Sequence, residues 1–582
     1  MKKLIALVIA MVMVLSLAAC GKKEEAPAES QTPAKTEETG KEATGEPAGS
    51  NAEQTVVNGE ADGFGGVITA QVTLEGDKIV DLVLVGESET AEIGGAALPK
   101  LQEAIIAAGT IDGVDGVSGA TWTSNGVFAA IKNAMGIEEA PAESAGAAEV
   151  KASGLKQGLG IHTEGRLGPG SDNTETPVYS FNNVIAYVIT DSEDRIVDLQ
   201  VDILEVITPN HDSADDNLIA GWPGSSYNWD EDGDGTVDGL YEETDDTWNA
   251  DLPNFLTKRQ KGDAYKMNSG TWTQEMDAYE SVFVGKNIDE VKAWVAAYTS
   301  DLNGRALHGT SDKPEDVAKY DALSDDEKAM LDGISTATMS LTDSHGNIIK
   351  AIEKAVANAE PISAEAGTIT KVGLGVTTTG RVGPGADDQG VGVYCLNTQA
   401  AGAAYDADGK VVAIITDLLE IITPNHDGAH DNQFTGWPGQ SYNADTNADG
   451  VVDTVFEQTP ESFLEQLSGY KTKRELDTNY KLNSGTWKGE ETIFENAFTG
   501  MTNDEIQNFF ATSFSDLNGR PLNGNSDKDE DVTKRAALND DQLAKIDSLS
   551  GATMSIKDGH GDMIGAINNA WVNAVEANIV IE

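Results

Sequence analysis

The sequence predicts an α+β protein in which a small antiparallel-sheet-plus-helix domain is followed by two larger, duplicated α+β domains of related type. Three observations support this prediction. Residues 56–137 show the pattern of strand, turn, strand and two helices. The chain then repeats itself at a constant offset of 215 residues, and all three segments contain versions of one short motif near their ends. A length of 582 residues also suits several domains rather than one.

The small domain is predicted from apolar spacing. Apolar and polar residues alternate over 68–75, which indicates a half-buried strand, and a turn leads to a return strand over 79–85. Helical spacing of apolar residues predicts helices over 97–108 and 127–135. The expected order is therefore strand, strand, helix, loop, helix, within a domain that spans 56–137.

The repeats follow a linker at 138–153. Gly158-Leu159-Gly160 recurs at 373–375, and the same 215-residue offset relates many later blocks. We therefore predict repeat domain A over 154–358, a linker over 359–368 and repeat domain B over 369–576. Each repeat is expected to contain a hairpin, a long acidic insertion and a closing helix. Ser324 and Glu327 form the pattern of a capping box that opens a short helix in repeat A.

The N-terminal residues 1–20 predict a lipoprotein signal peptide. Two lysines precede an apolar run over 4–17, which is shorter than the ~20 residues that a membrane-spanning helix needs. The run ends in Leu-Ala-Ala-Cys, which resembles a bacterial lipobox, so Cys20 is the expected lipidation site. Residues 21–55 have the composition of a disordered tether. We expect a cell-membrane protein that is lipid-anchored on the extracytoplasmic face.

The charge and cysteine content restrict the possible partners. The net charge of −58 argues against nucleic acid and against an anionic membrane surface as partners. It suits either a well-solvated extracytoplasmic protein or one that holds divalent cations. Only Cys20 and Cys395 are present, so no disulfide is expected within the mature chain. Cys395 is predicted to be a small buried residue, because Ser180 occupies the matching position of repeat A.

The recurring motif has the form Asp-x-x-Ser-Gly-Ala-Thr. Small residues and hydroxyl groups before a helix supply backbone N–H groups and a helix N-terminus, which bind phosphate well. The alternative is that the hydroxyl groups only cap the helix. In repeat A, Thr336 replaces the glycine of the motif. The candidate cofactor-binding residues are Asp115, Ser118, Gly119, Ala120 and Thr121 in the small domain, Asp332, Ser335, Ala337 and Thr338 in repeat A, and Asp547, Ser550, Gly551, Ala552 and Thr553 in repeat B.

The small domain resembles the bacterial FMN-binding domain of flavin-carrying subunits of the Nqr and Rnf complexes. The resemblance rests on Gly63–Gly66, on Glu89-Thr90-Ala91-Glu92-Ile93-Gly94 and on Asp115–Thr121 with the four residues 123–126. It adds Glu89 and Thr90 to the candidate site. It implies that a separate flavin transferase uses FAD to join FMN to Thr121 through a phosphoester. The repeats resemble the family less completely, so one to three covalent FMN groups are expected, on Thr121, Thr553 and Thr338 in falling order.

Two acidic loops show the calcium-loop pattern, with oxygen-bearing residues at loop positions 1, 3, 5 and 9 and glycine at position 6. The loops differ from an ordinary EF-hand at position 12, because the glutamate that usually stands there comes one place later. The alternative is a solvated acidic turn. The predicted calcium ligands are Asp230, Asp232, Asp234 and Asp238 in repeat A, and Asp445, Asn447, Asp449 and Asp453 in repeat B.

Histidines and tryptophans that recur in both repeats have a structural and a functional interpretation. His211 and His426 could bind metal or transfer protons, but a hydrogen-bonded structural role is the prediction. Four tryptophans could stack on a flavin ring, although core packing is expected for each: Trp222, Trp272, Trp437 and Trp487.

These patterns predict a membrane-anchored extracytoplasmic flavoprotein that relays electrons between a membrane donor and an external acceptor, neither of which the sequence identifies. A complete reductase is less expected than an electron carrier, because no substrate-reductase domain is evident. The alternative is a calcium-stabilised surface binding or scaffold lipoprotein with at most one flavin.

Overall fold

The computed structural model divides the chain into two compact units, residues 1–142 (unit 1) and 143–582 (unit 2). It describes residues 54–137 and 154–577, except for 63–65, 77, 87, 90, 92–93, 112–113, 115, 118–119, 172–176, 212–215, 230–233, 235, 237–238, 268–269, 335–336, 363–367, 387–391, 427–430, 445–453, 483–484, 523, 525 and 550.

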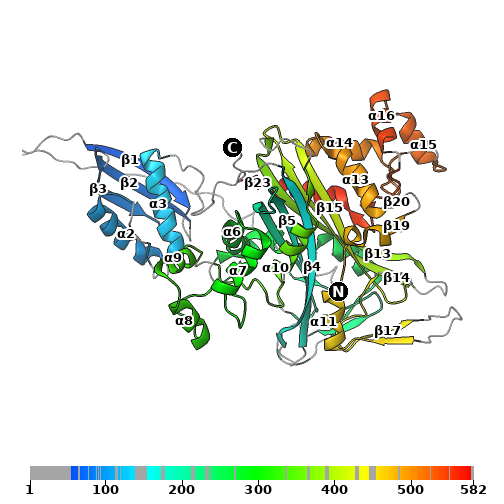
Figure 1. Ribbon diagram of the computed structural model, residues 1–582, viewed down its shortest axis with the longest axis horizontal. Coiled ribbons are helices and arrows are strands. Elements are labelled where there is room, and N and C mark those ends of the chain that lie inside the picture. The colour runs from blue at the N-terminus through cyan, green and yellow to red at the C-terminus, as the bar shows by residue number, and fades with distance from the viewer. Residues whose placement is uncertain are drawn as a thin grey trace, which may run out of the picture. The chain divides into compact units, whose positions relative to one another are not determined.

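Unit 1 is a three-stranded antiparallel sheet in the order β1-β2-β3, with two helices packed on one face (Figure 1). Alternate residues of β2 are buried against these helices, as the alternation over 68–75 predicts. Strand β1 was not predicted, because its polar sequence lacks alternation. It forms because it pairs with β2 along its whole length, from Gln54 opposite Glu75 to Asp62 opposite Val67. The elements are β1 (Gln54–Asp62), β2 (Val67–Glu75), β3 (Lys78–Val85), α2 (Gly94–Ala108) and α3 (Thr121–Met135).

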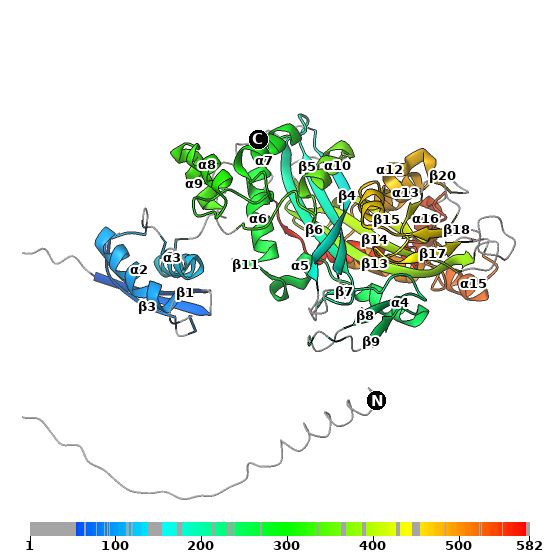
Figure 2. The same cartoon turned by 90° about the horizontal axis from the view of Figure 1, so that it is seen from below.

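Unit 2 contains two five-stranded sheets that pack face to face and share one hydrophobic core. Helices cover the outer face of each sheet, so the unit has four layers (Figures 1 and 2). The predicted repeats A and B therefore form a single compact unit. Sheet A has the order β12-β4-β5-β6-β7, formed by β12 (Glu360–Pro361), β4 (Lys156–Ser171), β5 (Pro177–Thr190), β6 (Ile196–Ile207) and β7 (Asn217–Leu218). Sheet B has the order β16-β15-β14-β13-β23, formed by β16 (Asn432–Gln433), β15 (Val411–Ile422), β14 (Gly392–Tyr405), β13 (Lys371–Ala386) and β23 (Val575–Glu576).

The helices and short hairpins of the two repeats correspond in order. Repeat A has β8 (Ser226–Trp229), β9 (Gly239–Glu242), α4 (Asp245–Asp251), η1 (Leu252–Asn254), α5 (Lys258–Lys261), η2 (Gly262–Ala264), β10 (Lys266–Met267), β11 (Gly270–Thr271), α6 (Trp272–Phe283), α7 (Ile288–Tyr298), α8 (Pro314–Asp321), α9 (Asp325–Gly333) and α10 (Ile348–Ala357). Repeat B has β17 (Ser441–Ala444), β18 (Thr454–Glu457), α11 (Pro460–Ser468), α12 (Lys473–Leu476), η4 (Asp477–Asn479), β19 (Lys481–Leu482), β20 (Gly485–Thr486), α13 (Trp487–Phe498), α14 (Asn503–Ser513), α15 (Asp529–Ala536), α16 (Asp540–Ser548), β21 (Lys557–Asp558), β22 (Gly561–Asp562) and α17 (Met563–Val572).

The two repeats meet reciprocally, as the halves of a two-fold dimer would. Trp222 donates its indole N–H to the carbonyl oxygen of Phe434 at 2.6 Å, and Trp437 donates to that of Ile219 at 2.9 Å. Asn183 donates to the hydroxyl of Thr398, which is its counterpart 215 residues later. Trp222 and Trp437 thus lie in the shared core, as the packing interpretation predicts.

Helices also cross between the repeats. Trp248 of α4 and Leu252 of η1 pack against Gly380 on β13, while α11 of repeat B packs against Gly165 on β4. A side chain at Gly380 would lie 2.2 Å from Leu252, so glycine is required for this close approach. The central interface therefore combines sheet packing with exchanged helices.

One packing contact recurs in all three segments of the chain. The closing helix crosses the first strand at a glycine, so closely that the helix backbone occupies the place of a side chain. In unit 1 a Cβ on Gly59 would lie 2.3 Å from the carbonyl oxygen of Ala130 in α3. Gly160 meets α10 and Gly375 meets α17 in the same way. The glycines position the loop that precedes each closing helix.

Candidate functional site

The motif of unit 1 leads directly into α3. Thr121 is the first residue of this 15-residue helix, and Ala120 is its N-cap. An alanine N-cap donates or accepts no side-chain hydrogen bond, so it leaves the first N–H groups of α3 without the usual capping oxygen. Asp115, Ser118 and Gly119, and the side chain of Thr121, lie outside the described residues.

Ser124 holds the motif against the helix. The backbone N–H of Val117 donates to the Ser124 hydroxyl at 3.0 Å, and that hydroxyl donates to the carbonyl oxygen of Ala120 at 2.8 Å. Ser124 is buried, so both bonds are shielded from water. The candidate site predicted from the sequence omitted this residue, although its place in the segment 123–126 was a usable signal.

Glu89 reaches the first turn of α3 from the loop after β3. Its carboxylate accepts a 2.5 Å hydrogen bond from the hydroxyl of Thr123, and both side chains are buried. Gly94, at the start of α2, faces this pair: a Cβ there would lie 2.1 Å from the Glu89 carboxylate. The bond therefore joins the loop before α2 to the first turn of α3. The prediction of Glu89 as a site residue found half of this pair and missed Thr123, while Thr90 lies outside the described residues.

The arrangement in unit 1 suits an anion. The positive end of a helix dipole and free helical N–H groups attract phosphate. The Glu89–Thr123 bond and the Ser124 bonds fix the two loops that border this helix end without supplying a capping side chain. The residues present therefore fit the phosphate of an FMN group at Thr121.

The motifs of the repeats are built differently. Thr338 lies ten residues before α10, and Thr553 lies ten residues before α17, so neither begins a helix. Instead, a buried glutamate holds each motif. Glu275 of α6 accepts hydrogen bonds from the backbone N–H groups of Thr338 and Met339 at 2.8 and 2.7 Å, and from the Thr338 hydroxyl at 3.0 Å.

Repeat B shows the same arrangement. Glu490 of α13 accepts from the N–H groups of Thr553 and Met554 at 2.6 and 2.7 Å, and from the Thr553 hydroxyl at 3.2 Å. In both repeats the motif is therefore separated from the closing helix, whereas the motif of unit 1 leads directly into α3. Glu275 and Glu490 were missed because they are distant in sequence and lie on helices that read as ordinary amphipathic elements.

The remaining motif residues occupy ordinary positions. Ala337 and Ala552 are buried, Gly551 adopts a left-handed φ of 108°, Asp332 lies in α9, and Asp547 in α16 contacts Arg535 at 3.3 Å. Ser335 and Ser550 lie outside the described residues. Neither aspartate contacts its own motif threonine through any hydrogen bond recorded among the described residues.

Each repeat also contains a buried ion pair, which in repeat A is part of a cluster that links β4, β6 and α5. Lys258 lies 3.3 Å from Glu205, and Arg166 lies 3.6 Å from it. Burial alone would raise the pKa of Glu205, but the two cations outweigh it and lower that pKa to about 2. Lys473 and Glu420, 3.2 Å apart, are the counterparts in repeat B.

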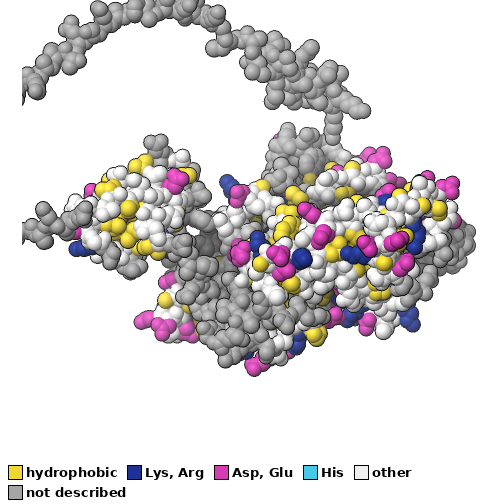
Figure 3. Space-filling view, turned by 90° about the horizontal axis from the view of Figure 1, so that it is seen from above, with side chains coloured by type: hydrophobic (Ala, Val, Ile, Leu, Met, Phe, Trp, Pro, Cys, Tyr) yellow, Lys and Arg dark blue, Asp and Glu magenta, His cyan; other side chains and the backbone are white. Residues whose placement is uncertain are grey.

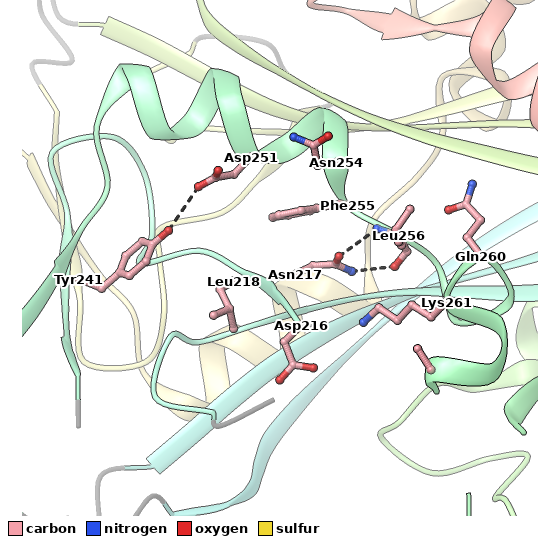
Figure 4. Close-up of a pocket in the computed structure, with 11 residues that line it drawn as sticks. Asp216, Asn217, Leu218, Tyr241, Asp251, Asn254, Phe255, Leu256, Gln260 and Lys261 are labelled. Atoms are coloured by element: carbon pink, nitrogen blue, oxygen red, sulfur yellow. Dashed lines mark hydrogen bonds between the residues drawn. The ribbon is translucent and has the colours of Figure 1, made fainter. Parts of the chain in front are cut away.

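A pocket of about 440 Å³ opens next to this cluster in repeat A (Figure 4). Leu218, Phe255 and Leu256 form apolar parts of the pocket wall, and most of the other lining residues are polar or charged. The hydroxyl of Tyr241 donates to Asp251 at 3.3 Å. The other lining residues are Asp216, Asn217, Asn254, Gln260, Lys261 and Ala264.

The histidines that follow Thr-Pro-Asn are held by carboxylates. His211 contacts Asp216 through Nδ1, and His426 contacts Asp431 in the same way. These pairs agree with the hydrogen-bonded structural role. Within the described ranges, no group of three or more metal-binding side chains gathers in one place.

Most residues of the predicted calcium loops are not among those that the structure describes. Asp230, Asp232, Asp238, Asp445, Asn447, Asp449 and Asp453 lie outside the described residues. Asp234 is described, and it accepts a 2.8 Å hydrogen bond from the backbone N–H of Thr236. This short turn neither requires nor opposes a bound cation, so calcium stays a prediction.

Three further features of the sequence can be compared with the structure: the cysteine of repeat B, the acidic charge and the length of the apolar helices. Cys395 is fully buried, as predicted, and burial raises the pKa of its thiol to about 12. Acidic side chains are spread over the described surface in Figure 3, in keeping with the net charge. Among the described helices, none combines the length and apolar character needed to cross a bilayer. Cys20 and the predicted signal peptide lie outside the described residues.

Comparison with known proteins identifies the first domain. Residues 63–136 match the FMN-binding domain family. A chlorophenol reductase from Desulfitobacterium hafniense is 31% identical over 214 residues, which cover 34% of this chain and 57% of that protein. The chain thus spans little more than half the length of this relative, and the aligned stretch is longer than the range 63–136. The chain therefore carries a domain of the FMN-binding domain family over residues 63–136, which identifies it as a flavoprotein.

Proposed function

We propose that this protein is a membrane-anchored, extracytoplasmic electron carrier that holds FMN covalently on threonine, with Thr121 as the principal site. The observation that carries the proposal is the start of α3. Thr121 opens a helix at the end of an FMN-binding domain, and its N-cap Ala120 provides no side-chain oxygen. A phosphate linked to Thr121 would take the place of the missing cap.

The chain's own residues would hold and orient the cofactor. The N–H groups at the start of α3 would bind the phosphate, Ser124 would keep the motif in place, and the Glu89–Thr123 bond would hold the neighbouring loop. FMN, when bound, supplies one- and two-electron transfer. A lipid on Cys20 and the tether 21–55 would place the domains outside the membrane, within reach of a membrane donor and an external acceptor.

The name of the relative supports a redox role but leaves the acceptor open. Chlorophenol reduction is the activity named for that protein, of which only part aligns with this chain. Since the aligned stretch is longer than the FMN-binding domain, part of the likeness lies outside residues 63–136. We favour an electron carrier over a complete reductase.

The test is flavin attachment. The chain is produced with and without a flavin transferase, denatured, and inspected for flavin fluorescence on the gel band. Fluorescence is expected only with the transferase, and Thr121→Ala should remove most or all of it. Thr338→Ala and Thr553→Ala, alone and combined with Thr121→Ala, count the remaining flavins. Thr69→Ala, at an exposed threonine of β2, is the matched control. A dark band in the presence of the transferase would contradict the proposal.

The second candidate is a calcium-stabilised surface scaffold with at most one flavin. It is favoured by the spacing of acidic residues in both insertions. Its test is thermal unfolding of unit 2 with excess calcium and with a chelator. A calcium-dependent rise in melting temperature that Asp230→Asn and Asp445→Asn reduce would support it, and an unchanged melting temperature would exclude it.

A further inference from the structure

Glu275 and Glu490 have the same geometry toward the motif threonines of the two repeats. Each lies near the start of its helix and is almost completely buried, with 0% and 2% of its surface exposed. One carboxylate oxygen accepts the two backbone N–H groups, and the other oxygen accepts the threonine hydroxyl. The recurrence of three hydrogen bonds at both sites shows that this pairing belongs to the fold of the repeats.

The two partners face different environments in repeat B. Glu490 is buried, whereas Thr553 is exposed. Thr553 is therefore accessible to a partner protein from the solvent side, while its hydroxyl donates a 3.2 Å hydrogen bond to a buried carboxylate. A hydroxyl nucleophile with a base within hydrogen-bond reach is the arrangement that covalent catalysis requires.

We propose that Glu490 is the general base for flavin attachment at Thr553. The inference rests on the proposed function, in which a transferase presents FAD to the motif threonines. The Thr553 oxygen attacks the phosphorus of the FMN half of FAD, and an O–P bond forms. The pyrophosphate bond breaks, AMP leaves, and the hydroxyl proton passes to Glu490. No electrons are exchanged, and the flavin keeps its oxidation state.

The backbone hydrogen bonds define a second role for the same carboxylate. By accepting hydrogen bonds from the N–H groups of Thr553 and Met554, Glu490 also fixes the backbone of the threonine in the loop before α17. A glutamine at this position could still accept hydrogen bonds through its amide oxygen, but it could not take up a proton. Glu490→Gln therefore separates the proton-accepting role from the positioning role.

Repeat A provides a comparison within the same chain. Gly551 has a φ of 108°, a conformation that side chains other than glycine rarely adopt, and Thr336 stands at the matching sequence position. Thr338 is also less exposed than Thr553. Although Glu275 is in place, the motif of repeat A should therefore present its hydroxyl less well. Flavin attachment is expected to be faster at Thr553 than at Thr338.

The experiment measures attachment at each threonine separately. Purified chain is incubated with a flavin transferase, FAD and magnesium, and the peptides that contain Thr121, Thr338 and Thr553 are quantified by mass spectrometry over time. Glu490→Gln should slow attachment at Thr553 by about 10²-fold or more, the usual contribution of a general base. Attachment at Thr121 should be unchanged. Glu461→Gln, at an exposed glutamate in the first turn of α11, is the control.

The pH dependence distinguishes a base from a structural clamp. The pH profile of the attachment rate at Thr553 should differ between the natural chain and Glu490→Gln, because only the glutamate can take up the hydroxyl proton, while the melting temperature should change little. Thr553→Ala should abolish attachment at this position, whereas Thr553→Ser should retain it because the hydroxyl is kept. Thr336→Gly should raise attachment at Thr338. An unchanged rate and pH profile in a folded Glu490→Gln variant would overturn the inference. Attachment at Thr121 without any at Thr553 would overturn it as well, yet leave the proposed function standing.

Discussion

The ion pair between Lys258 and Glu205 gives a stability prediction whose size follows from the structure. Both side chains are buried, and their charged groups are 3.3 Å apart. The pKa of Glu205 is lowered from 4.5 to about 2 despite its burial, which corresponds to about 3 kcal/mol of stabilisation. Among the neighbouring cations, Lys258 makes the largest contribution to the lowering of the Glu205 pKa. Lys258→Met should therefore destabilise unit 2 by about 2–3 kcal/mol at pH 7.

The lowered pKa of Glu205 also predicts how the stabilisation by this ion pair changes with pH. Because the pKa of Glu205 is lowered on folding, the stabilisation is present above pH 4.5 and is lost as the pH falls towards 2. The difference between the natural chain and Lys258→Met should therefore be full at pH 7 and clearly smaller at pH 3. Urea unfolding followed by tryptophan fluorescence at both pH values measures it.

Two variants serve as comparisons for this prediction. Lys473→Met breaks the equivalent pair with Glu420 and should behave alike. Lys292→Met breaks an exposed pair with Glu353 and should cost less than about 1 kcal/mol. If the loss caused by Lys258→Met is the same at pH 7 and pH 3, it arises from packing of the lysine stem, and the electrostatic reasoning is refuted.

Three further predictions concern packing and burial. Gly59→Val places a side chain where α3 runs, so it should destabilise unit 1 by about 1–3 kcal/mol or more and reduce flavin attachment; a thermal unfolding curve like that of the natural chain would contradict this. Trp222→Phe removes the 2.6 Å bond to the buried carbonyl of Phe434 and should cost unit 2 about 1–3 kcal/mol in urea unfolding, with Trp437→Phe as the reciprocal variant; a loss below about 0.5 kcal/mol would show that the bond contributes little. Cys395 should resist iodoacetamide at pH 8 in the folded chain, because burial keeps its thiol protonated, and should react after denaturation; mass spectrometry of its peptide decides between these outcomes.

Local pattern was sufficient for much of the fold. The alternation in β2, the helical stripe in α3 and the capping box of Ser324 and Glu327 at α9 were all predicted, because each depends only on residues within a few positions of one another. The constant offset between the repeats predicted corresponding elements in both halves. Strand β1 was missed because its formation depends on its partner rather than on its own pattern.

The sequence by itself determined the first domain and its motif, because the flavin-binding pattern is short and continuous around Thr121. Only the tertiary structure decided how the other two motifs are supported. Glu490 lies 63 residues before Thr553, and Glu275 lies as far before Thr338, so no local pattern connects them. The shared core between the repeats is likewise a product of packing, since apolar strands indicate burial without naming the surface that covers them. A buried carboxylate finds its partners in space, and the chain must fold before those partners can be identified.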